Sequence, residues 1–520
     1  MIIDFSQKRD AIDVSYVDEN NQIAIEELVL DKGFYNYVEC EESDPNKIDG
    51  FKSFKGSCIK RESAKYFTHH NINEFFNSDI PNLYPEFYKK SSKLSEPNPF
   101  SCDIEIEITD KYGYSNAELV ENRILSISFT DKNLESILFI LKNPDWPEIN
   151  DLDKGYIDGV LQDSLKQHYL THNYGYMIRQ FDTEVEMLQV FVECMNKHFH
   201  LLIGWNFLGY DWQYIFNRCV KIGVDIKKAS PTRKLSKKSI KVNTSTTVDL
   251  QIPTHRVVAC YMTLFKESLI YNNLTAYSLD AISELILGLH KVSYDGNLRT
   301  LYQTDYRRFI AYAFIDTILV MLIHKATNLL TVDFFQSFYT GVPYQKLSQN
   351  SISEALVYQE LKLDNIFLLE TEKTQNPQRK YQGGYVKPPL KKNVDAVLGE
   401  DYGALYPNSM ITMGLSPEAK IDEIQMEGHF ETNKDGKQVW FSTGFPANES
   451  ENQKWLKYRK LGYSLSPMGR IYKMDKDYLY VRIEKKLLAQ RKVFKGHMED
   501  IYLNIIPKLK KEINERKNNL

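Results

Sequence analysis

The chain has 520 residues, of which 42% are hydrophobic, and a formal net charge of -4 at pH 7. This length is too great for a single core, and the charge excludes a uniformly basic nucleic-acid coat, so any nucleic acid must be held by local basic patches. Six cysteines without a C-x-x-C pair argue against a zinc ribbon and indicate reduced thiols in an intracellular protein, and no uninterrupted apolar run reaches the ~18 residues of a membrane span.

The sequence predicts a first domain that ends near Pro97 and Pro99, followed by the strands of a sheet. Pro97 and Pro99 interrupt regular structure in SSKLSEPNPF and mark a boundary. Three short runs with strand patterning follow: CDIEIEI, RILSISFT and SILFILK. Thr183 and Glu186 form a capping box for a helix that leads into the apolar strand HLLIGW. Strands followed by alternating helix and strand predict a mixed α/β sheet.

The second half of the chain predicts further domains. FIAYAFIDTILVMLIHKA predicts a long apolar helix, and the polar passage TEKTQNPQRKYQGG links it to the next domain. Strand character returns from Tyr385 to Pro407, and from about Asp477 the chain predicts a basic helix. The expected fold class is therefore α/β and α+β, in several domains.

Paired carboxylates mark a first candidate metal site. Asp103 and Glu105 are two residues apart in the expected strand, so both side chains leave the same face and could hold a metal ion. Glu107 continues that face, which leaves the register open, and an exposed polar strand face explains the same spacing without function. Asp211 is at the start of a predicted helix, where a plain helix cap is the alternative.

One acid interrupts the apolar helix. Asp316 lies in its middle, where a carboxylate must be paired, hydrogen-bonded or bound to metal. Tyr312 is four residues earlier, on the same helical face. A buried hydrogen bond between this tyrosine and Asp316 is the structural alternative.

Together these segments resemble the three motifs of the 3′→5′ proofreading exonuclease of B-family DNA polymerases. The matching residues are Asp103 and Glu105 in D-I-E, Asn206, Gly209, Tyr210 and Asp211 in N-x-x-G-[FY]-D, and Tyr312 and Asp316 in Y-x-x-x-D. The resemblance implies an RNase H-like exonuclease domain and favours Glu105 over Glu107. It also implies that the four acids hold two Mg²⁺ or Mn²⁺ ions, while the tyrosine positions the water and the phosphate.

A second set of segments resembles the polymerase part of the family, in the T-even phage type. GEDYGALYPNSM is similar to the palm motif D-x-x-S-L-Y-P-S, with Ala404 and Asn408 in place of its serines. This resemblance implies that Asp401 is a catalytic, metal-binding carboxylate, that the backbone near Leu405 meets the triphosphate, and that Tyr406 packs under the deoxyribose. YQGGYVKPP resembles the Y-x-G-G element that precedes the palm.

The basic helix resembles the first fingers helix. In AQRKVFKGHM, Arg491 and Lys495 match the R-x-x-x-K pair that binds the incoming triphosphate, and their spacing places them on one helical face. A solvated charged face is the alternative. The family's second fingers motif and its D-T-D palm motif do not occur after Lys495, and the pair Asp475 and Asp477 is interpreted as an exposed loop.

The resemblance covers the whole chain but only the amino-terminal part of a complete polymerase. We expect an N-terminal domain in residues 1–98, the exonuclease domain in 99–330, a return to the N-terminal domain with a linker in 331–380, a partial palm in 381–476 and the first fingers helix in 477–520.

The expected function is the N-terminal subunit or fragment of a replicative DNA-directed DNA polymerase with proofreading, split or truncated so that a second polypeptide supplies the remaining palm, fingers and thumb. Expected partners are primer-template DNA, a single-stranded 3′ end, deoxynucleoside triphosphates and, as a further candidate, a sliding clamp. Each active site is expected to hold two metal ions, in the cytoplasm of a phage-infected cell and without a membrane. A stand-alone 3′→5′ DNA exonuclease and a non-catalytic nucleic-acid-binding scaffold are the alternatives.

Overall fold

The structure is a computed structural model that describes residues 2–7, 11–18, 22–29, 34–53, 58–64, 75–76, 98–146, 148–172, 174–241, 247–268, 270–344, 347–363, 366–367, 398–400, 402–432 and 438–518. The chain divides into two compact units. The first contains Met1–Asn36, Glu62–Thr68 and Ser78–Ala355, and the second contains Tyr37–Arg61, His69–Asn77 and Leu356–Leu520.

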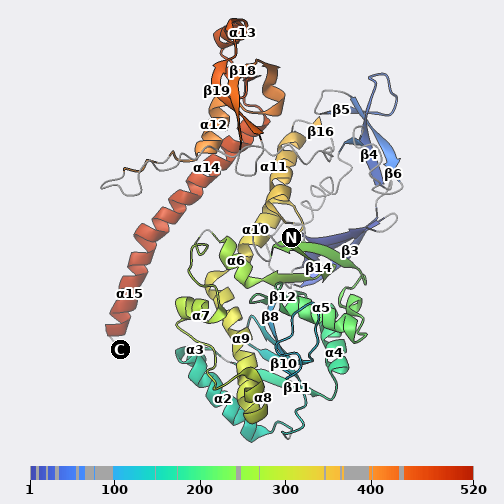
Figure 1. The fold of residues 1–520 in the computed structure, drawn as a ribbon, viewed down its shortest axis with the longest axis vertical. Helices are drawn as coiled ribbons and strands as arrows, with labels where there is room; N and C mark the ends of the chain where they lie inside the picture. The colour runs from blue at the N-terminus through green and yellow to red at the C-terminus, as the bar shows by residue number, and fades with distance from the viewer. Residues whose placement is uncertain are drawn as a thin grey trace. The chain divides into compact units, whose positions relative to one another are not determined.

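A six-stranded mixed sheet lies at the centre of the first unit (Figure 1). In spatial order its strands are β11 (Tyr176–Phe181), β10 (Ser136–Leu141), β9 (Ile124–Asp131), β8 (Pro99–Ile106), β12 (Leu201–Gly204) and β15 (Val257–Cys260). β8, β9 and β10 are antiparallel neighbours, β11 is parallel to β10, and β12 is parallel to both β8 and β15. The prediction that the three early strand runs are adjacent in one sheet is confirmed.

Helices cover both faces of this sheet. The helices of the first unit are α2 (Asp151–Leu165), α3 (Gln167–Thr171), α4 (Glu184–Lys197), α5 (Asp211–Lys221), α6 (Tyr261–Glu267), α7 (Leu279–Leu287), α8 (Leu298–Thr304), α9 (Tyr306–Thr327), α10 (Leu329–Thr340) and the first part of α11 (Gln349–Leu363), with a 3-10 turn at Ile226–Ala229. α4 and α5 pack on one face, around Phe129 and Trp212, and α2 and α9 pack on the other, around Leu138 and Phe314. Successive strand side chains point to opposite faces, so the same strands feed both cores.

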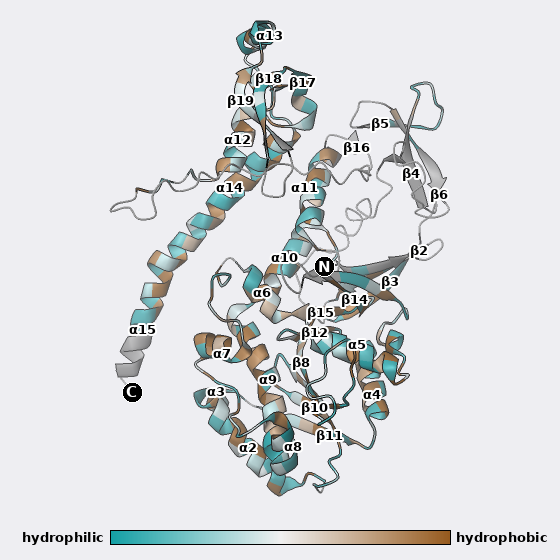
Figure 2. Ribbon diagram, in the orientation of Figure 1, coloured by the Kyte–Doolittle hydropathy of each residue, from teal (hydrophilic) through white to brown (hydrophobic). Residues whose placement is uncertain are grey.

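Two of these helices confirm the sequence pattern. α4 begins after Thr183, whose Oγ1 accepts a hydrogen bond from the backbone N–H of Glu186 at 3.2 Å; this is the Thr183 half of the predicted capping box, and the return bond from the Glu186 side chain does not form among the described residues. α9 is the predicted apolar helix; it packs on β8 and β9, and Figure 2 shows its apolar residues. By length and composition α9 could cross a membrane, but 83% of its apolar window is buried inside the unit, as expected of a core helix.

Two smaller antiparallel sheets complete the first unit. Three strands pair in the order β1 (Ile2–Gln7), β2 (Ala11–Val17), β3 (Ile23–Val29), and β13 (Leu235–Lys241) pairs with β14 (Thr247–Pro253). The turn between β14 and β15 is fixed to the first of these sheets, because the backbone N–H of His255 donates to Asp4 Oδ2 at 3.0 Å.

The second unit is built from small sheets and a long helical segment. Its sheets are β16 (Ile366–Phe367) with β5 (Lys47–Ser53), β6 (Cys58–Ala64), β4 (Phe34–Cys40) and β7 (Phe75–Phe76); β17 (Lys420–Glu423) with β21 (Arg470–Tyr472) and β20 (Ser464–Leu465); and the hairpin of β18 (Met426–Thr432) and β19 (Gln438–Pro446). Its helices are α12 (Leu405–Met413), α13 (Glu449–Lys460), α14 (Leu479–Asp500) and α15 (Ile506–Asn518), with a 3-10 turn at Pro417–Ala419.

The strand predicted from Tyr385 to Pro407 is wrong in its described part. Residues 398–400 and 402–404 are not in a strand, and α12 begins at Leu405. Ala404 has φ 54° and ψ 46°, a left-handed conformation that an extended strand cannot contain and that turns the chain into the helix. The YQGG segment lies outside the described residues.

The predicted basic helix is confirmed and begins at Leu479 as α14. A π-helical turn at Ile501–Ile505 connects it to α15, which contains Pro507. Proline has no N–H, and its ring clashes with the carbonyl four residues earlier in a regular helix. The wider π turn therefore accommodates the proline without ending the helix.

Candidate active site

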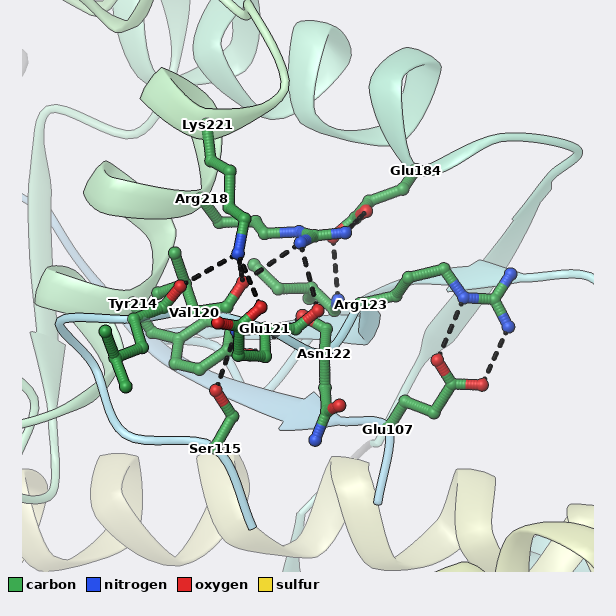
Figure 3. Close-up of polar contacts among 12 residues, drawn as sticks. Glu107, Ser115, Val120, Glu121, Asn122, Arg123, Glu184, Tyr214, Arg218 and Lys221 are labelled. Atoms are coloured by element: carbon green, nitrogen blue, oxygen red, sulfur yellow. Dashed lines mark hydrogen bonds and ion pairs between the residues drawn. The ribbon is translucent and has the colours of Figure 1, made fainter. Parts of the chain in front are cut away.

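The carboxylates of β8 lie at the centre of the large sheet, between β9 and β12. Glu105 is buried, and Asp103 is partly exposed toward a cavity. β8 ends at Ile106, and Glu107 beyond it accepts two hydrogen bonds from Arg123, at 3.1 Å from Nε and 2.9 Å from Nη2 (Figure 3). The structure therefore groups Asp103 with Glu105 and pairs Glu107 elsewhere.

Asp316 approaches the same point from α9. One carboxylate oxygen of each of Asp103, Glu105 and Asp316 lies within 4.8 Å of the others. Asp316 Oδ2 accepts from Lys291 Nζ at 2.6 Å, and Lys291 Nζ also lies 3.5 Å from the Tyr312 hydroxyl. The other oxygen, Asp316 Oδ1, is buried without a hydrogen-bond partner among the described residues. A hydrogen bond between Tyr312 and Asp316 is the structural alternative from the sequence. That alternative does not account for the burial of Asp316 Oδ1 without a partner among the described residues.

Asp211 is the first residue of α5, and the cap position before it is occupied by Tyr210. Asn206 has φ 55°, and its carbonyl accepts the backbone N–H groups of Gly209 at 2.8 Å and Tyr210 at 3.0 Å. A Cβ on Gly209 would meet Asn206 Oδ1 at 2.4 Å, so a larger residue would displace the Asn206 side chain from this close turn. The motif residues therefore act together to place Asp211 at the helix start, and the plain-cap interpretation is wrong.

Burial and mutual repulsion dominate the electrostatics of these acids. Burial raises the pKa of Asp103 well above its usual value, and repulsion by Asp211 and Asp316 adds to it. The pKa of Glu105 is raised in the same way, by burial and then by Asp316. Burial also raises the pKa of Asp211 to about 7, although backbone N–H groups and Lys291 oppose this. Acids that are unstable as free anions are stabilised by a bound cation.

The residues fit a hard divalent ion. Carboxylate oxygens from separate elements are the ligands that Mg²⁺ and Mn²⁺ prefer, and Asp316 Oδ1 is buried without a hydrogen-bond donor in the described part of the chain. Burial raises the pKa of Asp316, and the positive charge of Lys291 beside it partly offsets this rise. We therefore interpret Asp103, Glu105 and Asp316, with Asp211 nearby, as a candidate metal site.

Without divalent ions the first unit should lose stability as the pH rises. Because their pKa values are raised, the folded acids bind more protons than the unfolded acids above about pH 4. The free energy of unfolding therefore falls as the pH rises through the folded pKa, which is about 7 for Asp211. Burial lowers the pKa of His200, His255 and His324 to about 4, which has the opposite effect below about pH 6.5.

The measurement is therefore a difference between two proteins. In EDTA, the melting temperature of Asp103→Asn should fall less between pH 6.5 and 8 than that of the parent. The variant lacks one of the repelling carboxylates, while the histidines are the same in both proteins. Addition of Mg²⁺ at pH 8 should raise the melting temperature of the parent more than that of the variant. If the melting temperatures of the two proteins changed equally with pH, the Asp103 carboxylate would not interact electrostatically with the other buried acids.

A cavity of about 470 Å³ opens beside the acids. Its lining includes Asp103, Asn206, Trp205, Asp280 and Lys291. The Trp205 indole N–H donates to the carbonyl of Tyr277 at 2.9 Å, which fixes an aromatic wall. The volume lies within the range of small-ligand sites, and the lining combines polar with apolar and aromatic side chains.

A loop between β8 and β9 is held against α5 by hydrogen bonds to its carbonyl groups (Figure 3). Arg218 Nη1 donates to Val120 O at 3.0 Å, and the Tyr214 hydroxyl donates to Asn122 O at 2.8 Å. Arg218 is itself fixed by buried Glu184, at 2.7 Å between Nη2 and Oε2. Because α5 begins at Asp211, the helix that carries one candidate ligand also positions this loop.

Two residues near the acids were missed by sequence reasoning. Lys291 lies in the connection between α7 and α8, where a lone lysine has no periodic or motif signal. Tyr114 lies in the loop after β8, is 64% exposed and stacks on Tyr210 with ring centroids 5.5 Å apart. An exposed aromatic residue shortly after an acidic strand could have been noticed, but the sequence does not show that the chain folds back on Tyr210.

The candidate polymerase residues lie in the second unit. Asp401 lies outside the described residues. Leu405 and Tyr406 begin α12 and are 52% and 78% exposed. Arg491 and Lys495 are exposed on α14, which packs against α12, and Lys495 Nζ lies 3.6 Å from Glu499.

The acidic pair before α14 is an exposed loop, as interpreted from the sequence. Asp475 pairs with Lys473 at 2.5 Å and Asp477 with Lys485 at 2.6 Å. Both carboxylates are thus neutralised by local lysines.

Comparison with known proteins finds a similarity for the part of the chain that contains Asp103, Glu105 and Asp211. Residues 46–282 match the family model described as DNA polymerase family B, exonuclease domain. This part of the chain is therefore similar to the exonuclease domain of family B DNA polymerases. The match includes Asp103, Glu105 and Asp211 and ends before Tyr312 and Asp316.

Phage and archaeal DNA polymerases are similar to this chain. It is 27% identical over 322 residues to the DNA-directed DNA polymerase of Escherichia phage RB69 and 24% identical over 322 residues to that of Enterobacteria phage T4, in each case over 61% of this chain and 33% of the relative. It is 22% identical over 376 residues to the DNA polymerase of Pyrococcus horikoshii, over 69% of this chain and 26% of the relative. The match thus spans about a third of the length of the phage relatives.

Proposed function

We propose that the first unit is a 3′→5′ exonuclease that removes nucleotides from the 3′ end of single-stranded DNA with two divalent metal ions. The observation that carries this proposal is the convergence of Asp103, Glu105 and Asp316 within 4.8 Å, with a buried and unpartnered carboxylate oxygen. Hydrolysis of a phosphodiester requires charge stabilisation on the phosphoryl oxygens, and such a cluster can hold the cations that provide it.

The residues of the chain have distinct parts in this reaction. Asp103, Glu105, Asp211 and Asp316 would hold the metal ions, which would supply an activated water and stabilise the leaving 3′ oxygen. Tyr312, on the helical face of Asp316 and beside Lys291, is positioned to hydrogen-bond the water or the scissile phosphate. Lys291 holds Asp316 Oδ2 in place through a charge-assisted hydrogen bond.

The substrate class follows from the space around the acids. The cavity of about 470 Å³ beside Asp103 accommodates one unpaired nucleotide rather than a duplex end. The exposed ring of Tyr114 offers a stacking surface for a base of the same strand, an interaction worth about 1–3 kcal/mol per base. A strand bound in this way would present its terminal phosphodiester to the acids.

The purified chain should shorten a 5′-labelled single-stranded oligonucleotide one nucleotide at a time when Mg²⁺ is present, and EDTA should stop the reaction. The products are read as a ladder on a sequencing gel. An oligonucleotide with a phosphorothioate at its terminal linkage is the matched control and should be digested more slowly. Internal fragments without a ladder, or equal rates in EDTA, would contradict a metal-dependent 3′→5′ exonuclease.

We further propose that the second unit contributes part of a DNA polymerase active site. In the split or truncated arrangement, a second polypeptide would supply the remaining palm, fingers and thumb. The printed names of the relatives are DNA polymerases, and Leu405, Tyr406, Arg491 and Lys495 retain the residue types of the palm and fingers motifs. Primer-template DNA, deoxynucleoside triphosphates and a sliding clamp are the partners this proposal implies, in the cytoplasm of an infected cell. A stand-alone exonuclease remains the competing proposal.

Mixed with a polypeptide that carries the remaining palm, fingers and thumb, the chain should extend a primer, and Asp401→Ala should abolish that extension. Two-metal nucleotidyl transfer uses carboxylates from separate segments, and Asp401 is the candidate from this chain. Extension is measured on a labelled primer-template. Asp475→Ala, in the exposed loop before α14, is the matched control and should extend normally. Extension by the 520-residue chain alone would contradict the need for a second polypeptide.

A further inference from the structure

A second cavity lies beside Lys291, apart from the one that opens on Asp103. Its volume is about 290 Å³, and its lining includes Asp163, Lys166, His290, Lys291, Ser293 and Arg308. These residues come from the end of α2, the connection between α7 and α8, and the first turn of α9. We call this cavity the basic pocket. Lys291 lines both cavities, so the basic pocket adjoins the candidate metal site.

The backbone at Lys166 is held in a conformation that favours glycine. Lys166 has φ 50° and ψ -127° and joins α2 to α3. Its N–H donates to Gln162 O at 2.9 Å, and its carbonyl accepts from the N–H of Tyr169 at 3.1 Å, so both helices fix this geometry. A strained residue that carries a long cationic side chain into a pocket points to a role for that side chain, because glycine would relieve the strain.

The charges around the basic pocket do not cancel. Lys166 and Arg308 form no ion pair among the described residues, although Arg308 Nε donates to Ser293 O at 2.9 Å. The acid in the lining, Asp163, forms no ion pair there either. Lys291 is paired with Asp316 at 2.6 Å.

The histidine of the pocket is already matched by acids outside the lining. His290 lies 3.4 Å from Asp280 and 3.9 Å from Glu284. The basic pocket therefore has two unpaired cations against one acid, with a further cation shared with the metal site. Converging like charges favour an anionic ligand.

We propose that the basic pocket binds a phosphate group of a nucleotide. This rests on the proposed exonuclease function, because a DNA strand at the acids would bring phosphates next to Lys291. Lysine and arginine that converge from separate elements suit the oxygens of a phosphate, and Ser293 adds a hydroxyl to the lining. The phosphate has two possible sources: an internal diester of the bound strand, or the monoester of the released 5′-mononucleotide.

The binding test does not depend on catalysis. dAMP and inorganic phosphate are titrated into the full chain in EDTA by calorimetry, with Lys166→Gln as the test variant and Lys154→Gln as the control. Lys154 lies on the same helix and pairs with Asp151 at 3.1 Å, away from the pocket lining. Lys166→Gln should weaken dAMP binding by about tenfold if the monoester is the ligand, the loss expected for one charge-assisted hydrogen bond. Lys154→Gln should bind as the parent does.

The kinetic test identifies the other source. If an internal diester is the ligand, Lys166→Gln should raise KM for a ten-nucleotide oligothymidylate several-fold, leave KM for a dinucleotide unchanged, and leave dAMP affinity unchanged. Either result upholds the proposal and assigns the phosphate. The proposal is overturned if Lys166→Gln changes neither dAMP affinity nor the KM of the long strand by more than twofold.

A glycine variant separates binding from folding. Lys166→Gly should raise the melting temperature, because it relieves the backbone strain, while weakening phosphate binding as Lys166→Gln does. A purely structural lysine would give unchanged binding in both variants. If the parent proves inactive on DNA, the exonuclease proposal fails, and the titration in EDTA still decides whether the basic pocket binds phosphate.

Discussion

Asp103→Asn and Asp316→Asn should each lower exonuclease turnover by at least about 10³-fold, more than the ~10²–10³-fold loss typical for one stabilising hydrogen-bond donor. The reason is geometric: the three carboxylates lie within 4.8 Å, so each would help to hold the same cations, and loss of one would weaken the binding of all of them. Turnover is measured on a 3′-labelled single-stranded oligonucleotide in Mg²⁺. The variants should remain folded, since each removes a charge from a group of buried acids that repel one another.

Glu107→Gln provides the matched control for these variants. It is an acid on the same face of the sequence pattern, but its carboxylate pairs with Arg123 at 2.9 Å beyond the end of β8. Turnover of Glu107→Gln should stay within about twofold of the parent, because exposed ion pairs contribute little. If Glu107→Gln were as inactive as Asp103→Asn, the register of β8 at the site would have to be revised.

The sequence predicts the elements that carry the candidate site but not the way they meet. The strand patterns of β8, β9 and β10, the cap at Thr183 and the apolar run of α9 depend on local periodicity, and all are present. Periodicity alone could not choose between Glu105 and Glu107. Glu107 is distinguished by its ion pair with Arg123, a contact between two chain segments that no local pattern encodes.

Asp316 illustrates both the reach and the limit of sequence reasoning. A carboxylate in an apolar helix must have a partner, and that necessity is visible in the sequence. Its partner Lys291 lies 25 residues earlier, in an irregular connection whose course is set by the Lys291 N–H bond to Asp280 at 2.9 Å. Loop conformations of this kind are determined by hydrogen bonds and packing that no local pattern encodes.

The polymerase segments show a different limit. The motif around Leu405 and Tyr406 is recognised from its residue types and not from a structural pattern. The strand expected there is replaced by α12, because Ala404 adopts a left-handed conformation. Residue types alone gave no reason to expect that conformation, since a left-handed backbone normally favours glycine or asparagine. The proposed roles of Asp401, Arg491 and Lys495 stay predictions that the primer-extension experiment tests.

Lys291→Met should destabilise the metal-free first unit by about 3 kcal/mol at pH 8. Breaking a buried ion pair costs about 3–5 kcal/mol, and the lower end applies because the Lys291 side chain is 31% exposed while that of Asp316 is 4% exposed. The loss arises because Asp316 would keep its buried charge beside Asp103 and Glu105 without the cation that offsets it. At pH 5 the loss should shrink, since the raised pKa values allow these acids to be protonated.

Thermal denaturation in EDTA measures this effect, with Lys154→Met as the matched control. Lys154 pairs with Asp151 at the surface, where both side chains are largely exposed, so its replacement should cost no more than about 0.5 kcal/mol. Mg²⁺ should restore most of the melting temperature lost by Lys291→Met, because a divalent ion neutralises the same acids. A variant that melts with the parent in EDTA at pH 8, or that gains nothing from Mg²⁺, would show that Lys291 does not hold the acids in their metal-free arrangement.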